Sequence, residues 1–212
     1  MARRLLRPDA YGWLLLLILG TLLLSAFGGR IGAGGIVLQA GCLVYGQWIS
    51  QLPRRWWWPV WILAAAAVVV GIVSAVTDRP GARIVAATAS VLLAVATIGV
   101  ILRRIVQHPT ISGATVGGAV SAYLLAGLAF AYGYELVSAV TGEPFFATIE
   151  DPRTVDYVYF SFTTLTTVGY GDLTARTELG RMLAVSEALL GQLYLVTVVA
   201  LIVANLGRER RR

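Results

Sequence analysis

The sequence predicts an all-α membrane protein with six transmembrane helices and a short re-entrant helix between the fifth and the sixth. Three observations lead to this fold class. Of the 212 residues, 58% are hydrophobic and 13% are charged, whereas about a quarter of the residues in a soluble domain are charged. Apolar runs close to the length that crosses a bilayer, about 20 residues, recur along the chain. Short arginine clusters flank several of these runs, as topology signals do.

The first apolar run covers residues 10–27 and follows three arginines. A signal peptide also has a basic segment followed by an apolar one. We favour a retained helix, because the run is long for a signal peptide and no small-residue cleavage motif follows it. The other five predicted spans cover residues 31–50, 58–77, 82–102, 111–140 and 179–206.

The distribution of arginine predicts the orientation of these spans. Eleven arginines lie on one side of the predicted topology, and six lie on the other side together with most of the acids. Because cytoplasmic loops carry the excess of basic residues, we expect a multi-pass protein of the cell membrane with both termini in the cytoplasm. Topology therefore explains the net charge of +6, and we expect membrane lipid rather than nucleic acid as a partner.

Residues 163–172, Thr-Thr-Leu-Thr-Thr-Val-Gly-Tyr-Gly-Asp, carry the chemistry of the chain. A dehydrated cation needs several oxygens that bind it without holding it too tightly, and backbone carbonyls meet both needs. Successive carbonyls face one way only if the backbone alternates with left-handed residues, which glycine adopts without steric cost. Gly169 and Gly171 alternate with Val168 and Tyr170, and Thr167 can add a hydroxyl oxygen.

One such strand cannot surround an ion, because rings of carbonyl oxygens need about four strands around an axis. No second copy of the motif occurs in the chain. The sequence therefore predicts a homotetramer, in which three further copies of the chain complete the pore.

Residues 167–172 resemble the signature filter of potassium channels, and residues 111–206 resemble the pore domain of that family. The resemblance implies that the carbonyls of Thr167, Val168, Gly169 and Tyr170 bind K⁺ as it passes, and that no other cofactor is needed. It also implies that the Tyr170 side chain braces the filter and that Asp172 lies at the outer mouth.

Residues 152–165 are expected to form the pore helix, which enters from outside and ends midway through the membrane. Asp151 is a plausible N-cap with Pro152 at the first helical position, and Thr154 is an alternative cap. Thr166, between this helix and the filter, is placed among the supporting residues.

The pore helix departs from the family pattern at Tyr159 and Phe160, where many potassium channels carry tryptophans that brace the filter. No indole N–H can reach Asp172 from Phe160, so a tyrosine hydroxyl elsewhere is the open substitute.

Two residues of the last span are singled out. Glu187 is an acid inside an apolar helix, and such residues usually have a partner. We expect a structural hydrogen bond that supports the filter, with Ser161, Thr163 or Thr164 as the partner, and a proton sensor is the competing hypothesis. Gly191 lies where the potassium channel family often has a hinge glycine for gating.

The chain divides into a four-helix transmembrane domain, residues 1–107, and a pore domain, residues 108–212. The first domain occupies the position of a voltage sensor, whose fourth helix carries an arginine at every third position. Here residues 82–102 contain only Arg83, at the outer end, while Arg103 and Arg104 are adjacent at the inner end. We therefore expect no voltage gating by a charged fourth helix, and the role of the first four helices stays open.

The sequence thus predicts a potassium-selective channel that conducts passively and is not an enzyme. Two alternatives remain, a less selective cation channel and a non-conducting accessory subunit. Relative reversal potentials in potassium and sodium separate the first alternative from the prediction, and assembly with a partner channel separates the second.

Overall fold

A computed structural model describes residues 10–27, 33–50, 57–77, 80–107 and 113–209. These residues form helices and no strands, as an all-α prediction requires. Two loop residues, Phe146 and Ala175, make an isolated β-bridge. The helices are α1 (Ala10–Phe27), α2 (Ala33–Ser50), α3 (Trp57–Thr77), α4 (Pro80–Gln107), α5 (Gly113–Thr141), α6 (Thr154–Leu165) and α7 (Glu178–Glu209).

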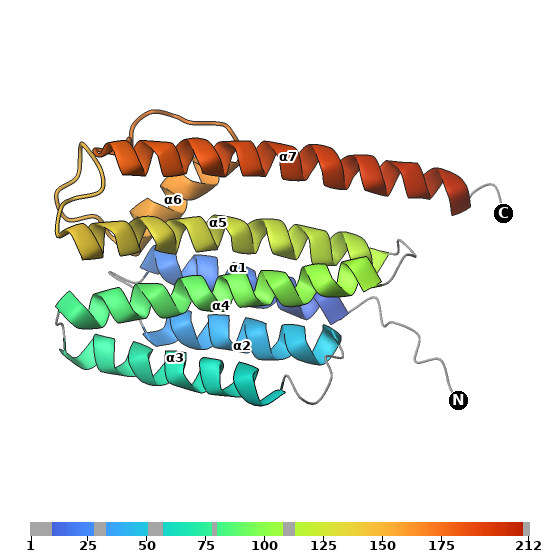
Figure 1. Cartoon of the computed structure of the whole chain (residues 1–212), viewed down its shortest axis with the longest axis horizontal. Coiled ribbons are helices and arrows are strands. Elements are labelled where there is room, and N and C mark those ends of the chain that lie inside the picture. Colours follow the sequence, from blue (N-terminus) through green and yellow to red (C-terminus); the bar gives the residue numbers. More distant parts are fainter. Residues whose placement is uncertain (1–9, 28–32, 51–56, 78–79, 108–112, 210–212) are drawn as a thin grey trace.

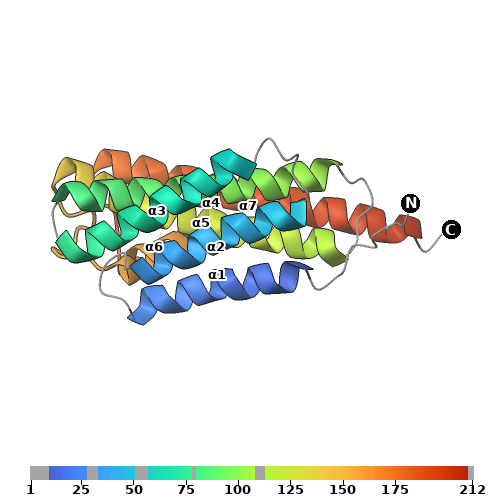
Figure 2. The ribbon, with the colours of Figure 1, turned by 90° about the horizontal axis from the view of Figure 1, so that it is seen from below.

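The long helices run up and down along one axis, and α6 is inserted between α5 and α7 (Figure 1). α6 starts at the end of the bundle where α5 ends and α7 begins. Its 12 residues rise about 18 Å, whereas a 29-residue helix such as α5 rises about 43 Å. In both views α7 extends past the other helices (Figure 2). α6 therefore ends partway along the bundle, and the chain then returns to the end where α7 begins.

Within the part of the chain that the structure describes, four helices contain segments long and apolar enough to cross a membrane by length and composition. These segments are Trp57–Ser74, Gly81–Ile105, Thr115–Thr141 and Glu178–Val198. The apolar part of α1, Tyr11–Ser25, is shorter, and α2 is diluted by Gln39, Gln47 and several glycines. A membrane protein with four such helices is thus supported, and the count of six spans stays a prediction.

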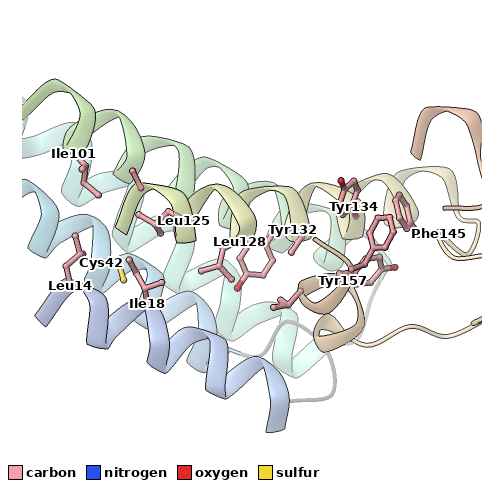
Figure 3. Packing of buried hydrophobic residues seen from close by; sticks show 14 of the residues in the cluster. Leu14, Ile18, Cys42, Ile101, Leu125, Leu128, Tyr132, Tyr134, Phe145 and Tyr157 are labelled. Carbon is pink, nitrogen blue, oxygen red and sulfur yellow. The ribbon is translucent and has the colours of Figure 1, made fainter. Parts of the chain in front are cut away.

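One hydrophobic core joins the four-helix part to α5 and α6 (Figure 3). Leu14 and Ile18 of α1 and Cys42 of α2 are buried in the same cluster as Leu125 and Leu128 of α5. The single cysteine is thus a small buried apolar residue, as such cysteines usually are. Because α6 packs on α5, the four-helix part packs against the helix that supports α6.

A second cluster holds α2, α3 and α4 together through Ile36, Leu43 and Leu93 and through small residues such as Ala64. Small residues let helix backbones approach closely in a membrane. A Cβ at Gly71 would meet the Ile36 side chain at 3.0 Å, which shows how close this approach is.

α4 carries a row of polar residues at seven-residue spacing. Arg83, Ser90, Thr97 and Arg104 share one face of the helix, because seven residues are close to two helical turns. We call these four residues, with Gln39 and Gln47 of α2, the polar seam. Ser90 and Thr97 are almost fully buried, and the Arg104 guanidinium lies 5.8 Å from the centre of the Tyr11 ring.

Candidate ion-conduction site

The pore helix begins two residues later than the sequence predicts. α6 starts at Thr154 with Arg153 as its N-cap. The Arg153 N–H donates to the Asp156 carboxylate (2.7 Å), and the Asp156 N–H donates to the Arg153 carbonyl (2.9 Å). The prediction of an Asp151 cap was therefore wrong, because the carboxylate that closes the first turn comes from within the helix. Thr154 is no cap either, since its hydroxyl donates to Glu135 at 3.4 Å.

The backbone after α6 alternates in hand. Thr167, Gly169 and Gly171 have φ values of 59°, 52° and 82°, in the left-handed region, while Val168 and Tyr170 between them do not. Glycine adopts this region freely, and a threonine there is uncommon. The alternation expected at the two glycines thus also includes Thr167, whose backbone is strained because it is not a glycine.

The N–H groups of this segment point back to α6. Val168 and Gly169 both donate to the Thr163 carbonyl, at 2.9 and 3.0 Å, and Thr167 donates to Thr164 at 2.9 Å. The Thr166 hydroxyl donates to the Phe162 carbonyl at 2.6 Å. No described hydrogen bond ends on the carbonyls of residues 167–170, so those oxygens remain available as ligands.

Tyr159 supplies the brace that the sequence left open. Its ring stacks on the Tyr170 ring with 6.2 Å between centroids and 6° between planes. Its hydroxyl also lies near the Asp172 carboxylate. One residue thus contacts both Tyr170 and Asp172.

Phe160, in contrast, lies on the opposite side of α6 from Tyr170. It is buried against Tyr134, Phe145 and Phe146, with ring centroids 5.3 to 5.9 Å away. Neighbouring residues on a helix diverge by about 100°, so only one member of the pair 159–160 can face the filter. The tyrosine hydroxyl that lies near Asp172 therefore belongs to the neighbour of Phe160, Tyr159.

The loop before α6 and the loop before α7 are hydrogen-bonded to each other. The Ala147 N–H donates to the Thr174 carbonyl at 2.9 Å, and the Arg176 N–H donates to Phe145 at 2.8 Å. Arg176 also pairs with Glu150 at 3.0 Å, although both side chains are exposed and the pair adds little stability. The loop after the filter is therefore tied to the loop before the pore helix.

The inner end of α6 is pressed against α7. A Cβ at Gly191 would collide with the Leu165 carbonyl oxygen and touch the Leu165 side chain at 2.9 Å. The Tyr123 hydroxyl of α5 donates to the same Leu165 oxygen at 3.1 Å. The structure thus supplies a packing reason for glycine at 191, and its predicted role as a gating hinge stays a prediction.

Glu187 is fully buried between α5, α6 and α7. Its Oε1 is 2.5 Å from the Ser161 hydroxyl, and its Oε2 is 2.5 Å from the Tyr134 hydroxyl. Among the partners named from the sequence, Ser161 is in contact, whereas the Thr163 hydroxyl bonds to Phe160 of its own helix. Tyr134 was missed, since nothing local in α5 marks it as polar-facing.

The segment after α6 and much of α7 are exposed in the single chain. Val168 is 54% exposed, Tyr170 is 72% exposed and Leu193 is 61% exposed. Such a continuous apolar surface marks an interaction site with protein or membrane.

Comparison with protein families finds one match, within the second half of the chain. Residues 120–208 match the model of a family described as an ion channel. No curated protein and no solved structure matches the chain. The matched part begins within α5, contains α6 and the filter, and ends within α7. It supports passive ion conduction by a membrane protein, and it does not reach α1–α4.

Proposed function

We propose that the chain is the pore-forming subunit of a potassium-selective channel, with four copies around one pore. The observation that carries the proposal is the alternating hand at Thr167, Gly169 and Gly171. The N–H groups of this segment donate to carbonyl groups of α6, whereas its own carbonyl groups accept no described hydrogen bond. Backbone carbonyls in this arrangement replace the water shell of K⁺ and release it again.

The proposed ligands are the carbonyls of Thr167, Val168, Gly169 and Tyr170, with the Thr167 hydroxyl at the inner end. Selectivity requires that these oxygens keep their spacing while ions pass between them. The Tyr159–Tyr170 stack and the position of the Tyr159 hydroxyl near Asp172 support that rigidity from outside the ion path.

A homotetramer follows from the same geometry. One strand offers carbonyls on one side of an ion, and four strands complete the rings. The exposed apolar residues of α7 and the exposed filter offer the surface that neighbouring copies would bury.

We further propose that α4 does not gate the channel by moving charge. A voltage sensor needs several charges in the membrane field, at about 2.3 kcal/mol per charge for each 100 mV. α4 carries Arg83 near its start and the adjacent Arg103 and Arg104 near its end, with uncharged Ser90 and Thr97 between them.

The test is potassium flux into liposomes that contain the purified protein, with sodium as the competing ion. We expect potassium to be strongly preferred and barium to block the flux. Gly169→Ala should abolish the preference, because a Cβ is strained at φ 52°. Gly133→Ala is the matched control, since Gly133 has ordinary φ and open space around its Cβ position.

Other results would favour the alternatives. Equal flux of both ions would indicate a less selective cation channel. No flux, together with stable assembly onto a conducting channel, would indicate an accessory subunit.

A further inference from the structure

We infer that Glu187 carries a proton and donates it to Ser161, so that a neutral carboxyl group locks the inner helix to the pore helix. The effect on conduction rests on the proposed function, whereas the proton on Glu187 follows from counting the hydrogens in three contacts. The carboxyl meets Ser161 and Tyr134 at 2.5 Å each, and the Ser161 hydroxyl lies 2.7 Å from the Gly127 carbonyl of α5.

Each of these three oxygen–oxygen contacts needs one hydrogen between its atoms. The Gly127 carbonyl has none to give, and the Ser161 and Tyr134 hydroxyls have one each. If Glu187 were ionised, Ser161 could donate to the carboxylate or to Gly127 but not to both. A protonated Glu187 completes the set: Tyr134 donates to Glu187, Glu187 donates to Ser161, and Ser161 donates to Gly127.

The surroundings favour the neutral form as well. Glu187, Ser161 and Tyr134 are each 0% exposed. Among the described residues no basic side chain pairs with Glu187, and the titratable groups that α5 presents to it are the phenols Tyr134 and Tyr123. The pore helix presents the uncharged Ser161. A buried carboxylate without a cation is costly, whereas a protonated one in a complete hydrogen-bond chain is not.

The chain of hydrogen bonds joins three helices directly behind the filter. Ser161 lies two residues before Thr163, whose carbonyl receives the N–H groups of Val168 and Gly169. Removing the proton would break the link from Ser161 to either α5 or α7. Glu187 is therefore a positioning residue, and alkaline pH should loosen the filter through it.

Infrared spectroscopy tests the proton directly, without any flux. We expect a protonated-carboxyl C=O stretching band in the wild-type protein at neutral pH, which shifts in D₂O and disappears in Glu187→Gln. Glu178→Gln, at the exposed start of the same helix, is the matched control and should leave the band in place. The inference is overturned if Glu187→Gln removes no such band.

Flux in liposomes tests the positioning role. Glu187→Gln should keep most of the potassium flux, because its amide donates to Ser161 and accepts from Tyr134, and it should lose the alkaline decline expected of the wild type. Glu187→Ala should lower the flux about tenfold or more at neutral pH, because a buried hydrogen-bond set is left open.

If Glu187→Gln lost as much flux at neutral pH as Glu187→Ala, a donor role for residue 187 would be contradicted. If no protein in the series conducts, the proposed function fails, and the infrared band still decides whether Glu187 holds a proton.

Discussion

The half of the chain from α5 to α7, the pore half, and the half from α1 to α4, the four-helix half, differ in how their buried polar groups are hydrogen-bonded. Behind the filter, Ser161, Glu187 and Tyr134 form a linked set in which every oxygen has a partner. In the polar seam, by contrast, several buried atoms have no described hydrogen-bond partner. They are Gln39 Oε1, Gln47 Nε2, Arg83 Nε, Ser90 Oγ and Arg104 Nη1.

An unsatisfied buried polar atom costs about 1–3 kcal/mol, whereas a satisfied network specifies one arrangement of its helices. The difference suggests that the pore half is held in a single geometry by directed bonds. The four-helix half relies on apolar packing through Leu43, Leu93 and small residues. Four predictions test this contrast.

The largest loss of stability is expected at Gly191, where α7 makes its closest contact with α6. Gly191→Ala places a methyl group against the Leu165 carbonyl, and overpacking of this kind costs about 1–3 kcal/mol or more in each subunit. We expect a lower melting temperature and loss of flux. If Gly191 serves only as a hinge, the variant should instead melt normally and show altered opening.

A matched pair of serines compares the two halves. Ser161 and Ser90 are both 0% exposed. Ser161→Ala should lower the free energy of unfolding by about 1–3 kcal/mol, because Glu187 and Gly127 lose their partner. Ser90→Ala should leave stability unchanged or raise it by about 1 kcal/mol, because it removes an unsatisfied hydroxyl oxygen. Denaturant titration in micelles measures both, and equal losses would refute the contrast.

Tyr159 should affect selectivity more than stability. Tyr159→Phe keeps the stack on Tyr170 but removes the hydroxyl beside the Asp172 carboxylate. We expect the potassium preference to fall about tenfold, because a polar contact with a charged group is worth about 1.5–3 kcal/mol. Reversal potentials measure the change, with Tyr45→Phe in α2 as the control. An unchanged preference would show that stacking alone braces the filter.

The smallest effect is expected from the seam arginines. Arg83→Gln and Arg104→Gln should leave the voltage dependence of the current within experimental error, because α4 carries no ladder of charge. A shift of the conductance–voltage curve in either variant would mean that α4 moves in the membrane field after all.

Several features could be predicted from local sequence. The helical spans follow from apolar runs, and the observed helices agree with them to within a few residues, except where α4 and α7 extend further. The left-handed positions at Gly169 and Gly171 follow from the chemistry of glycine. The helix start was misplaced by two residues, because Asp151, Thr154 and Asp156 are all good capping residues and the sequence does not rank them.

The sequence by itself determined that the chain is helical, apolar and equipped with one strand of alternating glycines, because these properties depend on neighbouring residues alone. Only the tertiary structure decided which side chains meet. Tyr159 rather than Phe160 faces Asp172, and Tyr134 reaches Glu187 across 53 residues. The physical reason is that the rotation of a helix about its own axis is set by the packing of its neighbours.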